Sequence, residues 1–204
     1  MPYIHESFAK GKIGEELLLK YLSARQDCAY VCDVSKDWNY REKGIDIIFY
    51  RHPTKNPALK TTDESELEKL VEKNVITEDQ PNPDYSRFTF EVKSCDRLAD
   101  TGNFFFETVS NLGRKTTGSF LYTEADFFTY YSIKEDIFYY MPLPQTKEFV
   151  LNGNFQKRTA KTTRWSMTKY HTLGIIVPRE SLLSGVKVAV QRNPFVRNGA
   201  VTGS

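Results

Sequence analysis

Two short segments of the chain, one largely apolar and one that alternates polar with apolar side chains, are each predicted to form a β-strand. Residues 44–49 are apolar apart from Asp46, and residues 87–93 alternate until they end on a charged pair. Successive side chains of a strand point to opposite faces, so Glu91 and Lys93 share one face, and the apolar residues beside them share the other. The pattern therefore predicts a carboxylate and an ammonium group side by side.

The segment before these strands has the period of an amphipathic helix. Residues 7–22 place leucines three, four and seven positions after Glu15, at Leu18, Leu19 and Leu22. Glu15 is therefore expected on the apolar side of this helix, where a carboxylate needs a partner. Two interpretations stay open: Glu15 pairs with a lysine at the boundary of the buried face, or it belongs to a functional site.

Two segments downstream are aromatic and are bounded by turn residues. Residues 102–111 and 136–144 are predicted to be strands, and 102–111 is interpreted as the third strand of the core. The interval between Asp46 and Glu91 is long and contains prolines and an acidic stretch. We predict an insertion at about 53–85 that contains a short acidic helix.

Length and composition favour one domain with an aromatic core. The chain has 204 residues, with 14 Phe and 12 Tyr. We expect a single domain over residues 1–190 and a flexible tail at 191–204, where no periodic pattern is found.

The sequence contains no stretch near the ~20 apolar residues of a membrane span, and no secretory signal is visible. Three cysteines, Cys28, Cys32 and Cys95, lack the second pair or the nearby histidines of a zinc site. Buried thiols in a reducing compartment are the preferred interpretation. We therefore expect a cytoplasmic protein without a membrane partner.

A carboxylate pair with a lysine, held on strands in an apolar frame, is the chemistry of a metal-dependent phosphodiesterase. Carboxylate oxygens are ligands of Mg²⁺, and a lysine can orient or activate a water molecule. The pattern Asp46 … Glu91-x-Lys93 resembles the PD-(D/E)XK nuclease superfamily, and the order of glycine, aromatic and acidic residues after it looks like a phage and mobile-element branch. The proline that gives the superfamily the first letter of its name is missing here, and Gly44-Ile45 precedes Asp46 instead. The resemblance covers about residues 11–143.

This resemblance implies an α/β fold with a restriction-endonuclease-like core: a helix, a three-stranded meander, a second helix and a further strand. It also implies that Asp46 and Glu91 hold Mg²⁺, for which Mn²⁺ substitutes, with help from the carbonyl of Val92. Lys93 would position or activate the attacking water. Glu15 would complete the metal site, directly or through a second metal or a water.

Two further carboxylates, Glu107 and Asp126, are weaker candidates for the same site by analogy. Each has a structural alternative. Asp126 would cap or brace a helix or a turn, and Glu107 would pair with a lysine at the edge of the site.

The net charge of +2 conceals a separation of charge along the chain. Residues 1–100 hold 15 Lys and Arg against 19 Asp and Glu, whereas residues 147–204 hold 10 against 2. The second region mixes cations, hydroxyl groups and aromatic rings, a mixture that suits phosphate contact. We expect its basic part, 147–190, to bind DNA rather than to be only a solvated surface, through Lys157, Arg158, Lys161, Arg164 and Lys169.

The function predicted from the sequence is a Mg²⁺-dependent endonuclease acting on DNA, of a phage, restriction, homing or junction-resolving type. One alternative is a catalytically silent nuclease fold that binds DNA as an accessory protein. Another is a protein unrelated to nucleic acids, in which Asp46 and Glu91 lie far apart. A homodimer or higher homo-oligomer would suit two cuts in one duplex.

Overall fold

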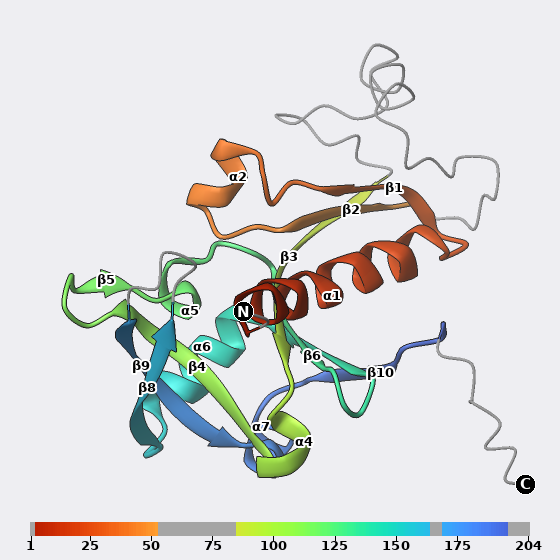
Figure 1. The fold of residues 1–204 in the computed structure, drawn as a ribbon. Helices are drawn as coiled ribbons and strands as arrows, with labels where there is room; N and C mark the ends of the chain where they lie inside the picture. Colours follow the sequence, from red (N-terminus) through yellow and green to blue (C-terminus); the bar gives the residue numbers. More distant parts are fainter. Residues whose placement is uncertain (1–2, 53–84, 164–168, 196–204) are drawn as a thin grey trace, which may run out of the picture.

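The computed structural model describes residues 3–52, 85–163 and 169–195, which form a mixed α/β fold with two sheets (Figure 1). The larger sheet has six strands in the order β1-β2-β3-β6-β7-β10. These strands are β1 (Cys28–Asp33), β2 (Ile47–Arg51), β3 (Ser86–Cys95), β6 (Phe127–Ser132), β7 (Ile137–Pro142) and β10 (Ala189–Arg192). β3 and β6 are parallel, and the other neighbours in this sheet are antiparallel.

The second sheet has four antiparallel strands in the order β5-β4-β9-β8. They are β4 (Asn103–Asn111), β5 (Thr116–Thr117), β8 (Gln156–Thr163) and β9 (Lys169–Pro178). The longest helix, α1 (Tyr3–Ser23), lies along the larger sheet. The shorter helices are α2 (Trp38–Glu42), α4 (Leu98–Thr101), α5 (Ser119–Tyr122), α6 (Leu143–Asn152) and α7 (Arg179–Gly185).

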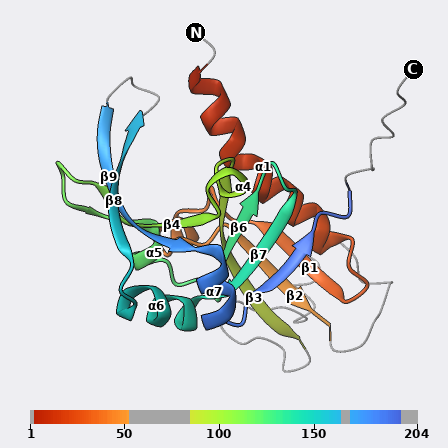
Figure 2. The same cartoon turned by 90° about the horizontal axis from the view of Figure 1, so that it is seen from below.

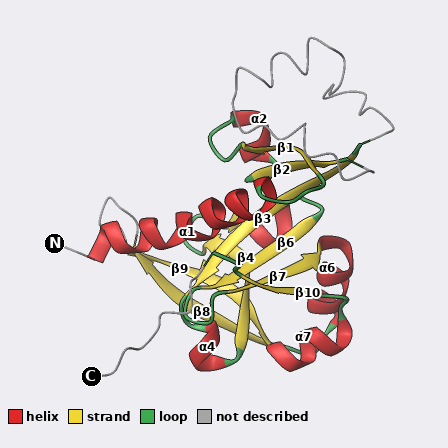
Figure 3. Ribbon diagram, turned by 90° about the vertical axis from the view of Figure 1, so that its right-hand side faces the viewer, coloured by secondary structure: helices red, strands yellow, loops and turns green. Residues whose placement is uncertain are grey.

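Each face of the larger sheet has its own core. On one face, Leu18 and Leu22 of α1 are buried against Phe90 and Val92 of β3 (Figure 3). On the other face, an aromatic core joins the two sheets. It includes the ring pairs Phe104–Tyr130, with centroids 5.2 Å apart, and Phe106–Phe128, with centroids 5.8 Å apart. β3 therefore contributes alternate side chains to two different environments.

The hairpin of β8 and β9 projects from the body of the molecule. Figure 2 shows that its free end and the N-terminal end of α1 project to the same side, and Figure 3 shows the same arrangement at right angles. β9 is the connection between this hairpin and the rest of the second sheet, because it pairs with β4 on one edge and with β8 on the other.

Most predicted elements are confirmed, with shifted boundaries. The predicted helix 7–22 lies within α1, and the segments 44–49, 87–93, 102–111 and 136–144 contain or overlap β2, β3, β4 and β7. The assignment of 102–111 as the third core strand is wrong, because β4 belongs to the second sheet. The first strand of the larger sheet is β1, which the sequence pattern did not reveal. Cys28–Val31 are all buried, so they show no alternation.

The second helix implied by the resemblance is not found between β3 and β6, an interval that the structure describes in full. That interval holds β4, β5 and two helices of four residues each, α4 and α5. Aromatic and β-branched residues dominate residues 103–109, and such residues favour a strand over a helix.

The boundary predicted for the flexible tail is also wrong. β10 extends to Arg192, and Asn193 is 3% exposed because it is hydrogen-bonded to Asp136 through both its backbone and its side chain, each at 2.9 Å. Residues 196–204, the acidic helix and nearly all of the insertion at 53–85 lie outside the described residues. The insertion connects β2 to β3, which are antiparallel neighbours.

Within the described residues, no helix combines the length and the apolar character that a membrane span requires. Cys28, Cys32 and Cys95 form no disulfide: Cys28 is buried, and Cys32 and Cys95 are partly buried.

Candidate active site

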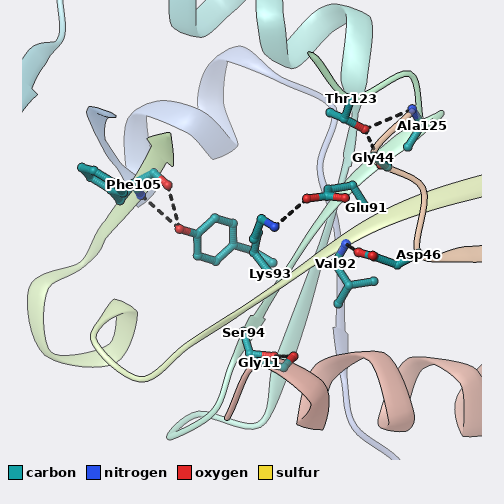
Figure 4. A network of polar contacts seen from close by, with 11 residues as sticks. Gly11, Gly44, Asp46, Glu91, Val92, Lys93, Ser94, Phe105, Thr123 and Ala125 are labelled. Carbon is teal, nitrogen blue, oxygen red and sulfur yellow. Dashed lines mark hydrogen bonds and ion pairs between the residues drawn. The ribbon is translucent and has the colours of Figure 1, made fainter. Parts of the chain in front are cut away.

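Glu91 and Lys93 lie side by side on the face of β3 that is turned toward the second sheet. The Nζ atom of Lys93 is 2.5 Å from Oε1 of Glu91 (Figure 4). The side chain of Glu91 is 4% exposed, whereas that of Lys93 is 42% exposed, so the pair extends from the interior to the surface. This is the placement that the alternation along the strand predicts.

Asp46 immediately precedes β2 and is held against β3 by two hydrogen bonds. Its N–H donates to the carbonyl of Phe90 at 2.8 Å, and its Oδ2 accepts from the N–H of Val92 at 2.8 Å (Figure 4). Its carboxyl group is also close enough to Glu91 for a hydrogen bond. The N–H and C=O of a strand residue point to the same edge, so the carbonyl of Val92 faces Asp46 too. Oxygen atoms of these three residues therefore lie near one edge of β3.

Burial and a neighbouring carboxylate make the ionisation of Asp46 unfavourable. Burial and then the charge of Glu91 raise the pKa of Asp46 from 3.8 to about 7. Burial by itself would lower the pKa of Lys93, but Glu91 and Asp46 outweigh it and hold this pKa above its ordinary value. Lys93 is therefore a permanent cation, and a further cation at the carboxylates would relieve their repulsion.

Glu15 reaches this cluster from α1. Burial, followed by the charges of Asp46 and Asp33, raises its pKa from 4.5 to about 7, and Lys12 opposes this shift. The charges of Asp46 and Lys93 therefore both act on the carboxyl group of Glu15. Its part in a reaction stays a prediction.

A direct contact joins the middle of α1 to β3. The hydroxyl of Ser94 donates a hydrogen bond to the carbonyl of Gly11 at 3.1 Å (Figure 4). The same hydroxyl accepts one from the N–H of Gly14 at 3.0 Å. A Cβ atom added to Gly14 would lie 2.5 Å from the Ser94 oxygen. Glycine is therefore required where the helix touches the strand, one residue before Glu15.

Of the two weaker candidates, Glu107 lies near the site and Asp126 is engaged elsewhere. Burial raises the pKa of Glu107, while the charge of Lys93 and a hydrogen bond from the Ser119 backbone oppose this. Oδ2 of Asp126 accepts from the N–H and the hydroxyl of Thr89, at 2.8 and 2.9 Å, and its own N–H donates back to that hydroxyl at 2.9 Å. Asp126 therefore braces β3 against the start of β6, which matches its structural alternative.

Tyr122 is a residue of this region that the sequence analysis missed. Burial, then the charge of Glu91, raises its pKa, and Lys93, Asp46 and Glu107 also act on it. Sequence alternation could not have identified Tyr122, because it is the last residue of the four-residue helix α5.

The oxygen atoms at this edge of β3 resemble the ligands that Mg²⁺ prefers. Among the described residues, no group of three or more His, Cys, Asp or Glu side chains is arranged to hold a metal ion. Mg²⁺ does not require such a group, since it is usually bound by one or two carboxylates together with waters and substrate phosphates. Asp46, Glu91 and the Val92 carbonyl form a set of this kind, and the repulsion between the carboxylates favours a cation. The residues therefore fit Mg²⁺ completed by a substrate.

Three of the predicted DNA-binding residues lie on the projecting β8–β9 hairpin. Lys157, Arg158 and Lys161 are exposed on β8, the edge strand of the second sheet. Alternation places Lys157 and Lys161 on one face of the strand and Arg158 on the other. Arg164 and the side chain of Lys169 lie outside the described part of the chain.

Comparison with known proteins gives no match: no family model, no curated protein and no solved structure is similar to this chain.

Proposed function

We propose that this protein is a Mg²⁺-dependent endonuclease that hydrolyses DNA phosphodiester bonds on a core of the PD-(D/E)XK type. The observation that carries the proposal is the contact of Asp46, Glu91 and Lys93 at one edge of β3. If the pattern were a coincidence of sequence, Asp46 and Glu91 would open onto different surfaces. Their proximity speaks against a protein unrelated to nucleic acids.

The order of the elements also supports the proposal. α1 is followed by three antiparallel strands, β1, β2 and β3, and then by β6 in parallel with β3. Asp46 precedes the second of these strands and Glu91-x-Lys93 lies on the third. This agrees with the helix, meander and further strand that the resemblance implies, except that β4 and β5 stand where a second helix is implied.

The proposed mechanism assigns a different task to each side chain. Asp46 and Glu91 would hold the cation with the carbonyl of Val92. When bound, Mg²⁺ would neutralise charge on the scissile phosphate and lower the pKa of a coordinated water. Lys93 would orient the attacking water and stabilise negative charge that develops on the phosphate. Glu15 would accept a hydrogen bond from water at the same edge.

DNA would be held by the basic part of the chain. The projecting β8–β9 hairpin exposes the side chains of Lys157, Arg158 and Lys161. A DNA backbone that lies beside the hairpin could therefore contact all three. Backbone contacts of this kind contribute affinity without sequence preference.

The test is cleavage of a panel of DNA forms: plasmid, linear duplex, single strand and branched DNA, with Mg²⁺ or Mn²⁺. Cleavage should stop with EDTA and return with added cation. Lys93→Ala should abolish turnover while cation binding persists, and Asp46→Ala should lose both, because an oxygen ligand is gone. Lys134→Ala is the matched control, since Lys134 also pairs with a carboxylate, Asp100, but outside the site.

Equal cleavage by wild type and Lys93→Ala would refute the assignment of the site. DNA binding and cation binding without cleavage of any DNA form would favour the catalytically silent, accessory DNA-binding protein instead.

A further inference from the structure

Tyr122 approaches the candidate site from a different part of the fold than the carboxylates. A Cβ atom added to Gly44 would lie 2.8 Å from Cε2 of the Tyr122 ring, so the ring lies directly against the backbone two residues before Asp46. The charges of Glu91 and Lys93 both act on the pKa of its hydroxyl. The side chain is 43% exposed, so a substrate in solution can reach it.

The position of Tyr122 is fixed by the residues on either side of it. The hydroxyl of Thr123 donates to the carbonyl of Gly44 at 2.7 Å, a buried hydrogen bond that ties the end of α5 to the turn before Asp46 (Figure 4). The ammonium group of Lys147 donates to the carbonyls of Leu121 and Thr123, at 2.9 Å each. The backbone of Tyr122 is therefore held between two anchored residues, close to the turn before Asp46.

The phenol is suited to donate a hydrogen bond. Its pKa is raised, so it keeps its proton at neutral pH. Within the described residues, the Tyr122 hydroxyl makes no hydrogen bond to another protein group, whereas the Lys93 ammonium is already paired with Glu91. A phosphodiester has two non-bridging oxygens that accept hydrogen bonds, and donors aimed at developing charge are effective in sites shielded from water.

We propose that Tyr122 is a further catalytic residue, whose hydroxyl donates a hydrogen bond to a non-bridging oxygen of the scissile phosphodiester. The inference rests on the proposed endonuclease function and adds a donor from α5 to the groups on β2 and β3. The site then contacts the phosphate from both sheets, because α5 packs against β4.

The first test compares Tyr122→Phe, which removes the hydroxyl alone, with Tyr85→Phe, a tyrosine that stacks edge-on against His52 near the start of β3. Single-turnover cleavage at saturating Mg²⁺ should fall on the order of 100-fold for Tyr122→Phe and stay unchanged for Tyr85→Phe. DNA affinity measured with Ca²⁺, and the rise in melting temperature on adding Mg²⁺, should be the same for all three proteins. Wild-type cleavage rates for Tyr122→Phe would overturn the inference.

The second test distinguishes a phosphate contact from a structural role. DNA with one non-bridging oxygen of the scissile phosphate replaced by sulfur offers a weaker acceptor at a known position. One of the two diastereomers should slow cleavage by the wild type more than cleavage by Tyr122→Phe. The sulfur weakens the hydrogen bond from the Tyr122 hydroxyl, and the variant does not make that bond. The same ratio of rates for both proteins with both diastereomers would exclude the contact. If the wild type cleaves no DNA at all, both the inference and the proposed function fail. If the wild type cleaves DNA and Tyr122→Phe cleaves it equally well, the inference fails and the proposed function stands.

Discussion

The hydroxyl of Ser94, on β3, accepts a hydrogen bond of 3.0 Å from the backbone N–H of Gly14, which lies inside α1. The same hydroxyl donates to the carbonyl of Gly11, so one side chain is bonded to the helix at two points. Glu15 is the next residue of the helix, and Lys93 is the preceding residue of the strand. The distance between the helix and the site is therefore set by a serine and a glycine that have no part in the proposed chemistry.

Replacing Ser94 with alanine should destabilise the protein by about 1–2 kcal/mol, because the two partners on α1 lose a hydrogen bond in a partly buried contact. For a chain of this size, that corresponds to a fall in melting temperature of roughly 2–8 °C. Ser110→Ala is the control, since the Ser110 hydroxyl bonds only to exposed backbone of β5, at 3.2 and 3.4 Å. Equal melting temperatures for Ser94→Ala and wild type would show that the contact contributes nothing.

Gly44→Ala should reduce both stability and cleavage. Gly44 has a φ of +59°, a conformation that L residues rarely adopt, and the added Cβ would meet the Tyr122 ring at 2.8 Å. Gly102→Ala is a matched control, because Gly102 has a φ of +64° but nothing within 4 Å of an added Cβ. Backbone strain should lower the free energy of unfolding of both variants by about 1 kcal/mol or more. Only Gly44→Ala should also slow cleavage. A cleavage rate equal to that of Gly102→Ala would mean that the ring can move aside freely.

The pH dependence of stability should differ between wild type and Asp46→Asn in the absence of divalent cations. Asp46 has a folded-state pKa of about 7 against an ordinary value of 3.8. Between these values the folded chain holds a proton that the unfolded chain has released, so the contribution of Asp46 to stability falls as pH rises. Asparagine does not ionise and keeps an acceptor for Val92. Asp46→Asn should therefore melt at the same temperature as wild type near pH 4 and at a higher temperature at pH 8.

The comparison must be made between variants, because other groups change stability in the opposite sense. The hydrogen bond from Arg25 holds the pKa of Asp27 below its ordinary value, so that pair is lost at low pH in every variant. Glu42→Gln, at an exposed carboxylate of α2, is the control. Adding Mg²⁺ at pH 8 should raise the melting temperature of wild type and of Glu42→Gln but not of Asp46→Asn. A constant difference between wild type and Asp46→Asn at both pH values would contradict the crowding of carboxylates.

Affinity for duplex DNA should depend steeply on salt, and the dependence should identify the face of β8 that meets the phosphates. Lys157 and Lys161 share one face and Arg158 occupies the other. Replacing both lysines with alanine should reduce the slope of log affinity against log salt by up to about 1.8, since each phosphate contact contributes about 0.9. Arg158→Ala would change the slope by about half as much if the opposite face binds.

Lys134→Ala with Lys187→Ala removes two exposed cations away from β8 and serves as the control. If the β8 variants bind DNA as this control does at every salt concentration, the hairpin is a solvated surface and the duplex is held elsewhere.

The sequence was sufficient to predict the elements whose residues follow a clear period. α1 has a helical period, and β3 alternates apolar with polar or charged residues, so the side-by-side placement of Glu91 and Lys93 follows from the pattern. β1 escaped detection because Cys28–Asp33 show no such alternation. The tail boundary was misplaced because β10 has only four residues, too few for a period to be visible.

The rest of the site depends on which strands become neighbours, and local pattern carries no such information. Alternation orients Glu107 relative to its own strand, but the packing of the second sheet on the larger one decides that the charge of Lys93 acts on it. Tyr122 comes near Asp46 through a contact with Gly44, a residue far away in the chain. In the sequence, Asp126 was as good a candidate for the site as Glu107. In the structure, its carboxylate instead accepts a hydrogen bond from the hydroxyl of Thr89.

The pairing of β4 with β9 has a consequence for the time at which the protein becomes competent during synthesis. Glu15, Asp46, Glu91, Glu107 and Tyr122 all leave the ribosome before β9, residues 169–178, exists. Closing so long a loop is entropically unfavourable, and the strand that carries Glu107 has its long partner only when β9 arrives. A chain that ends before β9 therefore contains every residue of the candidate site, but the strand that carries Glu107 lacks its long partner.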